Sequence, residues 1–248
     1  MSNDFFRFKR FTVWQDKCAM KVGTDSVILG AWAKGGRRVL DIGTGTGLLA
    51  LMMAQRFTDA SVTAIDIDCM ACLQADENVK ASPFSRQIKV ICSSLQDFVK
   101  EKCSSSEASE TFTIPSQDSS LTANCYDSII CNPPFYDHAL TCPNARRDTA
   151  RHATSLTYGE LFNCAYALLS RHGAFSAIIP AECRSSFVNE AAKAGLHIWR
   201  TCSVITTAAK PPRRYMLTFG KRQETYIEDT EIVIGSRQYK QLTKDFYL

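Results

Sequence analysis

The stretch Asn132-Pro133-Pro134-Phe135 carries the most specific chemistry in the chain. It follows an apolar run, Ser128 to Cys131, that predicts a buried strand. Because proline has no N–H and a fixed φ, the prolines leave backbone carbonyls at the end of that strand as acceptors. With a carboxamide and an aromatic ring beside them, these acceptors suit an amine on a planar ring. The motif therefore indicates methylation of a nucleobase amine, provided that a methyl-donor site exists elsewhere. A simple turn at an asparagine before proline is the alternative.

A glycine-rich turn supplies a candidate donor site. The residues Val39 to Ile42 predict a short buried strand, and Gly43, Gly45 and Gly47 follow it before a helix. Glycines at this place let the backbone approach a ligand closely, and the helix N-terminus favours negative charge. Asp66 ends the next predicted strand, where an acidic side chain can hold ribose hydroxyls.

A nicotinamide dinucleotide site also has a glycine turn followed by an acidic residue at the end of the next strand. Two details of the sequence distinguish between the two cofactors. The spacing is G-x-G-x-G and not the G-x-G-x-x-G of dinucleotide sites. Asp41 also precedes the glycines on the strand itself. Its carboxylate would repel a pyrophosphate but would attract a donor's ammonium, directly or through water. Both details favour S-adenosylmethionine, and a tight turn that binds nothing remains the alternative.

Strands and helices alternate along the chain, which predicts an α/β fold with a mostly parallel sheet covered by helices on both faces. The predicted strands are 39–42, 61–65, 88–91, 126–131, 174–179, 198–205 and 215–219. The predicted helices are 48–55, 69–81, 156–169 and 184–194. Residues 99–124 are polar and without periodicity, so we expect a loop insertion there within a single domain of residues 1–248.

Composition bounds the function only loosely. A chain of 248 residues with 45% hydrophobic and 22% charged residues is long enough for one α/β domain. The net charge of +4 is compatible with a nucleic-acid partner but does not require one. No apolar run approaches the roughly 20 residues of a membrane span, so we expect no membrane partner.

The eleven cysteines predict neither disulfides nor a metal site. Met1 to Gln15 lacks a secretory apolar segment, which favours a cytoplasmic protein with reduced thiols. Cys69 and Cys72 form a lone C-x-x-C pair without the two further ligands that a tetrahedral zinc site needs. We therefore expect no metal cofactor.

The motifs together resemble a known superfamily. Asp41 to Gly47 with Asn132 to Phe135 is similar to the class I S-adenosylmethionine-dependent methyltransferases that methylate amines. Asp16 to Asp25 and Leu29 to Trp32 narrow the resemblance to bacterial tRNA adenine-N6-methyltransferases, which modify the adenosine at position 37 beside the anticodon of a valine tRNA. The resemblance continues through residues 147–152, 212–214 and 246–248.

This resemblance implies a Rossmann-like sheet of seven strands with the last strand antiparallel, S-adenosylmethionine as cofactor and tRNA as substrate. It implies Asn132 and Pro133 on the target amine, within a catalytic motif that also contains Pro134 and Phe135. The implied cofactor-binding residues are Lys21, Gly23, Thr24, Asp41, Gly43, Gly45, Gly47, Asp66, Ile67, Ser94, Leu95 and Asn132.

Two assignments stay open, one in the N-terminal segment and one in the region that binds the donor's adenine. Residues 1–36 are expected to lie over the cofactor site, although Thr24 or Asp25 could equally cap the following helix. Ser94 stands where the family often has an acidic residue near the donor's adenine, with Asp97 later. The residue that contacts the adenine amine is therefore not assigned.

Basic clusters are the candidate RNA contacts, because phosphate contacts position RNA without reading its sequence. The residues of these clusters are Arg147, Arg151, His152, Arg213 and Arg214. A solvated basic surface is the alternative for each cluster. Residues 5–11 interleave aromatic and basic side chains, either as an RNA-contacting arm or as aromatics that pack the N-terminus onto the domain.

Three other functions use parts of the same pattern. A glutamine methyltransferase of release factors shares the Asn-Pro-Pro motif, but it usually has a helical N-terminal domain, and only residues 1–36 precede the first predicted strand. A DNA adenine methyltransferase would need a target-recognition domain that we do not find. A catalytically silent RNA-binding protein would not need Asn132 and Pro133. We expect a monomeric tRNA methyltransferase.

Overall fold

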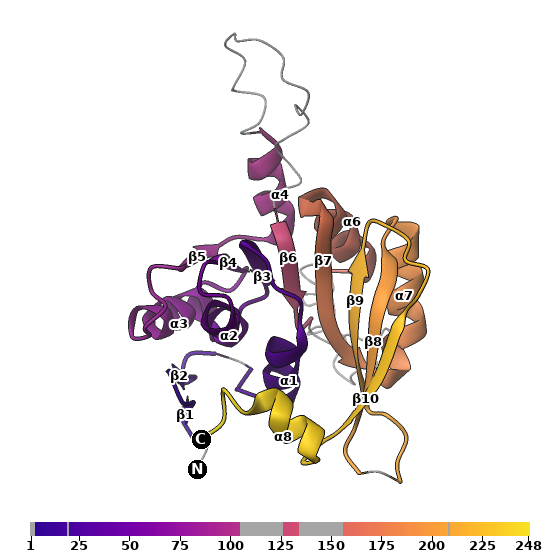
Figure 1. Cartoon of the computed structure of the whole chain (residues 1–248). Helices are drawn as coiled ribbons and strands as arrows, with labels where there is room; N and C mark the ends of the chain where they lie inside the picture. The colour runs from indigo at the N-terminus through magenta and orange to yellow at the C-terminus, as the bar shows by residue number, and fades with distance from the viewer. Residues whose placement is uncertain (1–2, 19, 105–125, 134–155, 208) are drawn as a thin grey trace, which may run out of the picture.

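The computed structural model describes residues 3–18, 20–104, 126–133, 156–207 and 209–248 (Figure 1). Several sequence predictions therefore fall outside the described residues. They concern the polar segment from residue 105 onward, Pro134, Phe135, Arg147, Arg151 and His152.

An eight-stranded sheet runs through the molecule in the order β10-β8-β9-β7-β6-β3-β4-β5 (Figure 1). Its strands are β3 (Arg38–Ile42), β4 (Ser61–Asp66), β5 (Ile88–Cys92), β6 (Tyr126–Cys131), β7 (Leu169–Pro180), β8 (His197–Ile205), β9 (Arg214–Gly220) and β10 (Glu228–Val233). Among these described strands, only β9 is antiparallel to its neighbours, β7 and β8. The mostly parallel sheet is thus confirmed, and β3 to β9 match the seven strands that the resemblance implied.

The strand β10 was not predicted. It pairs in parallel with β8 at the edge of the sheet, and its sequence begins with two acidic residues, Glu228 and Asp229. Charges of this kind suit an exposed edge, because they discourage pairing with another chain. Because of these polar residues, the strand shows no alternation of apolar residues from which it could be predicted.

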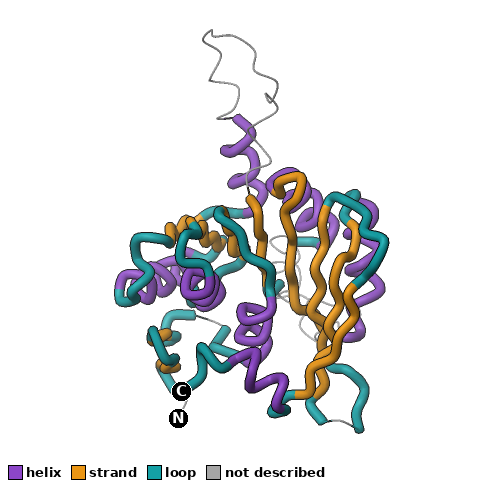
Figure 2. Tube along the Cα trace, in the orientation of Figure 1, coloured by secondary structure: helices purple, strands orange, loops and turns teal. Residues whose placement is uncertain are grey.

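Helices cover both faces of the sheet (Figure 2). The helices α1 (Thr24–Trp32), α2 (Leu48–Arg56), α3 (Cys69–Lys80) and α8 (Arg237–Thr243) lie on one side. The helices α4 (Leu95–Ser104), α6 (Tyr158–Leu168) and α7 (Arg184–Lys193), with the short 3-10 turn η1 (Ala181–Cys183), lie on the other. Two buried hydrophobic clusters, one on each side, hold these layers to the sheet.

The helix α4 was not predicted from the sequence. Residues 99–104 were expected to belong to the polar loop, but α4 continues to Ser104. Phe98 is buried and Val99 packs against the same cluster, so one face of this polar helix is anchored. Lys100 also pairs with Asp97 one turn earlier, at 3.1 Å.

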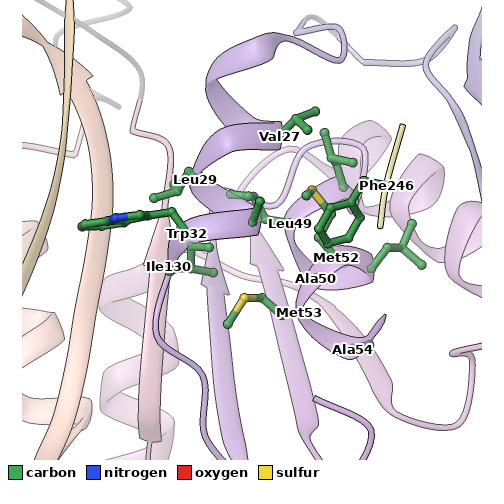
Figure 3. Close-up of a cluster of buried hydrophobic side chains, with 14 of the residues drawn as sticks. Val27, Leu29, Trp32, Leu49, Ala50, Met52, Met53, Ala54, Ile130 and Phe246 are labelled. Atoms are coloured by element: carbon green, nitrogen blue, oxygen red, sulfur yellow. The ribbon is translucent and has the colours of Figure 1, made fainter. Parts of the chain in front are cut away.

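The helices α1 and α2 approach each other closely. A side chain on Gly30 would place its Cβ 2.7 Å from the sulfur of Met52, so only glycine fits without a shift. Figure 3 shows Val27 of α1 and Leu49 of α2 in one buried cluster with Phe246 from the C-terminal tail. This packing fixes α1 at the carboxyl edge of the sheet, where the candidate site lies.

The N-terminus forms a small hairpin of β1 (Phe5–Arg7) and β2 (Thr12–Trp14). Phe8 and Phe11 are buried, and Phe8 stacks on Tyr247 at a centroid distance of 6.2 Å. The backbone N–H of Lys9 donates to the carbonyl of Phe246 at 2.9 Å. Of the two interpretations of residues 5–11, the structure thus favours aromatics that pack the N-terminus onto the domain.

Candidate active site

A cavity of about 410 Å³ lies at the carboxyl ends of β3, β4, β5 and β6. This volume is in the range of small-molecule sites, and the place is where open α/β sheets bind ligands. The residues predicted for the site that line the cavity are Lys21, Gly43, Gly45, Asp66, Ile67, Ser94, Leu95, Asn132 and Pro133. The predicted residues that do not line it are Gly23, Thr24, Asp41 and Gly47.

The glycine turn after β3 forms the floor of the cavity. Gly43 and Gly45 have φ angles of 68° and 55°, which side chains rarely adopt. A Cβ added at either residue would meet no protein atom within 4 Å, so the space above them is open to a ligand. Gly47 has a different task, because its Cβ would lie 3.3 Å from Ala75 of α3. It lets α2 pack against α3.

Asp41 lies beneath this turn and not on the cavity wall. Its side chain is fully buried, and its Oδ2 accepts hydrogen bonds from the hydroxyl of Thr44 at 2.6 Å and from the N–H of Ala50 at 3.1 Å. Its Oδ1 is buried and has no hydrogen-bond partner among the residues described. Burial raises the pKa of Asp41 to about 7. In this structure the carboxyl group therefore joins the turn to the start of α2.

Asp66 lies at the end of β4 on the cavity wall. Its Oδ2 accepts a hydrogen bond from the N–H of Gly45 at 2.8 Å, and its Oδ1 accepts one from the N–H of Asp68 at 3.0 Å. The carboxylate is thus held in place by two loops, and the remaining lone pairs of its oxygens can accept bonds from hydroxyl groups.

Ser94 caps α4 at the other end of the cavity. Its hydroxyl donates to the carboxylate of Asp97 at 2.7 Å and accepts from the N–H of Asp97 at 3.1 Å. The hydrogen bond that Ser94 donates, together with Lys100, lowers the pKa of the exposed Asp97. Gln96 also lines the cavity and was not considered from the sequence. Asp97, the acidic residue nearest in sequence to Ser94, is therefore engaged in the cap of α4.

Asn132 follows β6, and its amide makes one long-range contact. Its Nδ2 donates to the hydroxyl of Ser26, in the first turn of α1, at 2.9 Å. Its Oδ1 is buried and accepts no hydrogen bond from the described part of the chain. Pro133 lines the cavity beside it. The amide of Asn132 thus lies at the cavity wall, and its buried oxygen has no donor among the described residues. Ser26 was missed from the sequence because no motif connects it with Asn132.

The late basic loop between β8 and β9 reaches the same edge of the sheet. Arg214 pairs with Pro180 at the end of β7, and its guanidinium donates to Asp25 of α1 at 2.8 Å. Arg213 is exposed. From the sequence, Thr24 or Asp25 was a possible cap of α1. That alternative is wrong, because the N-cap residue is Gly23 and no side-chain hydrogen bond caps the helix. Asp25 instead binds Arg214.

Within the described ranges, no group of three His, Cys, Asp or Glu side chains is placed to hold a metal ion. None of the helices in those ranges combines the length and the apolar character needed to cross a membrane.

The fold and the site together define a class I methyltransferase. The family model for ribosomal protein L11 methyltransferase (PrmA) matches residues 26–108, the part from α1 to α4 that contains the glycine turn and Asp66. The crystal structure of a predicted O-methyltransferase, protein Atu636 from Agrobacterium tumefaciens, superposes with a TM-score of 0.61 at 17% identity. That match covers 90% of this chain and 96% of the other, and it supports the fold.

Full-length relatives give the particular family. A Bacteroides fragilis protein named tRNA1(Val) (adenine(37)-N6)-methyltransferase is 43% identical, over 100% of this chain and 99% of its own length. A Klebsiella pneumoniae protein of the same name is 37% identical, over 98% of this chain and 94% of its own. The chain belongs to the family of tRNA1(Val) (adenine(37)-N6)-methyltransferases.

Proposed function

We propose that this protein, as a single-domain monomer in the cytoplasm, methylates N6 of adenosine 37 in tRNA1(Val) with S-adenosylmethionine as methyl donor. The observation that carries the proposal is the amide of Asn132 at the wall of the cavity, whose buried Oδ1 has no donor among the residues that the structure describes. Membership of a family whose relatives carry this activity in their names supports the choice of substrate.

The cavity fits the proposed donor. The open space above Gly43 and Gly45 admits a ligand directly against the backbone, and Asp66 can accept bonds from ribose hydroxyls. Ile67 and Leu95 offer apolar contacts to the faces of an adenine ring. When bound, S-adenosylmethionine supplies a methyl group on a cationic sulfur. Asp41 acts beneath the turn, where it keeps the glycines in their unusual conformation.

The target amine needs two acceptors, because its lone pair is delocalised into the adenine ring. Oδ1 of Asn132 and the carbonyl of Pro133 would each accept one of its N–H groups. These bonds favour a pyramidal nitrogen whose lone pair is free to attack. Catalysis is then mainly positioning and complementarity to the altered nitrogen, and no strong base is required. Phe135, by prediction, stacks on the base.

The carboxyl edge of the sheet also suits RNA. Arg213 is exposed there, on the same loop as Arg214, so it can contact a phosphate near the cavity. The predicted contacts of Arg147, Arg151 and His152 remain proposals. An anticodon-loop adenosine fits this arrangement, because extruding a loop nucleotide costs less than extruding a paired one.

The test is a side-by-side methylation assay with labelled S-adenosylmethionine on tRNA, ribosomal RNA, DNA and release factor. We expect label in tRNA alone, loss of activity in Asn132→Ala, and nearly unchanged donor affinity in that variant. Asn189→Ala is a matched control, since Asn189 is exposed on α7. Label on release factor alone would assign the protein to glutamine methylation and overturn the proposal.

A further inference from the structure

The contact between Ser26 and Asn132 joins two segments that lie 106 positions apart in the chain. Ser26 lines the same cavity as Asn132 and is half-buried. We propose that Ser26 is a positioning residue for methyl transfer, whose hydroxyl binds the Nδ2 end of the Asn132 amide and so holds this amide in place for the target amine. This inference rests on the proposed function of Asn132.

The orientation of the amide decides whether Asn132 can act. The two ends of a carboxamide have almost the same shape, but one accepts hydrogen bonds and the other donates them. The terminal torsion of asparagine is broad and roughly two-fold, so its own rotamer preference does not choose between them. The amide oxygen can accept a hydrogen bond from an amine substrate, whereas the NH₂ group can only donate one. A rotation by half a turn would therefore abolish the clamp.

The neighbours of Asn132 in the chain offer little help in fixing this torsion. Pro133 has no N–H to donate to the amide oxygen, and Cys131 is buried within β6. The oxygen itself is buried and accepts no hydrogen bond from any residue in the described ranges. Buried acceptors usually have partners, and one without a donor is destabilising. A serine hydroxyl can donate or accept, so Ser26 could bind either end of the amide; in this structure it accepts from Nδ2, and this bond holds the amide in place.

The position of Ser26 is itself well defined. It lies in the first turn of α1, and the next turns of this helix pack against α2 through Gly30. The preceding residue, Asp25, is bound to Arg214 at the start of β9. The hydroxyl is therefore presented from a turn that is held by two other parts of the fold, as a positioning role requires.

The experiment compares Ser26→Ala and Ser26→Thr with the wild type in single-turnover methylation of tRNA at saturating donor and tRNA. We expect Ser26→Ala to lower the rate about tenfold, as for a lost hydrogen bond, while Ser26→Thr stays within about twofold of wild type. Affinity for S-adenosylhomocysteine, measured by calorimetry, should change by less than about twofold in either variant, which also shows that both are folded. Ser186→Ala on α7 removes one serine hydrogen bond far from the cavity and is expected to leave the rate unchanged.

Three results would overturn the inference. They are a wild-type rate in Ser26→Ala, a rate loss matched by an equal loss of S-adenosylhomocysteine affinity, and a Ser26→Thr variant as slow as Ser26→Ala. A wild-type enzyme that modifies release factor and not tRNA would refute the proposed function instead. The same two variants would then be compared on release factor, because a glutamine amide makes the same demand on Asn132.

Discussion

The buried carboxyl of Asp41 should make the stability of the protein depend on pH in an unusual direction. The side chain is fully buried, and this burial raises its pKa from 3.8 to about 7, although the bonds from Thr44 and Ala50 lower it. Because the folded state holds the proton more tightly than the unfolded state, the contribution is fully present below pH 4. It is lost as the pH rises through about 7.

The size of the effect follows from the shift. A pKa difference of this size corresponds to about 4 kcal/mol of unfolding free energy over the pH range between the two pKa values, or about 1.4 kcal/mol for each pH unit inside that range. Asp41→Asn should remove the dependence, because the amide oxygen can still accept from Thr44 and Ala50 and carries no charge. Between pH 5 and 7, the unfolding free energy of the variant should therefore gain about 2.3 kcal/mol relative to wild type, because the slope falls to half as the pH reaches the folded pKa.

Urea denaturation of both proteins at pH 5, 6, 7 and 8, at constant ionic strength, measures this difference. Other titrating groups are the same in the two proteins, so they cancel in the difference curve. A flat difference between pH 5 and 7 would show that Asp41 is ionised throughout and would refute the account of its burial.

Four further perturbations test separate parts of the site. Asp66→Asn should weaken donor binding about tenfold or more, since charge-assisted bonds to ribose hydroxyls are lost; unchanged calorimetric affinity would remove Asp66 from the donor site. Gly45→Ala should abolish donor binding, whereas Gly235→Ala, with a similarly positive φ of 79° and open space around it, should cost only about 1 kcal/mol of stability. Arg213→Ala should weaken tRNA binding and reduce the salt slope by about one, and an unchanged slope would place Arg213 off the RNA. Thr157→Ala breaks the capping box of α6 and should cost about 1 kcal/mol in urea denaturation, with no loss if the cap is dispensable.

The sequence predicted the elements of the fold where hydrophobic runs are long. The strands β3 to β6 and the helices α2, α3, α6 and α7 follow the predicted ranges closely, whereas β7 begins at Leu169 and not at residue 174. The hairpin of β1 and β2 and the edge strand β10 were missed, because three-residue strands and acid-rich edges show no apolar alternation. The helix α4 was missed because its anchoring by Phe98 depends on the tertiary structure.

For the candidate site, the sequence identified residue types better than side-chain directions. Gly43, Gly45 and Asp66 were predicted at the cavity, and they line it. Asp41 was placed near the donor, but its side chain points to the turn and to α2, which a linear motif does not specify. The pairing of Arg214 with Asp25 also joins segments far apart in the chain, and no local pattern predicts it.

The most direct test of the central claim uses two tRNA1(Val) transcripts that differ only at position 37. The purified protein is incubated with S-adenosylmethionine and either the adenosine-37 transcript or one with guanosine there, and the products are digested and analysed by mass spectrometry. The account predicts N6-methyladenosine at position 37 of the first transcript and no methylation of the second. Equal methylation of both transcripts, or of neither, would contradict it.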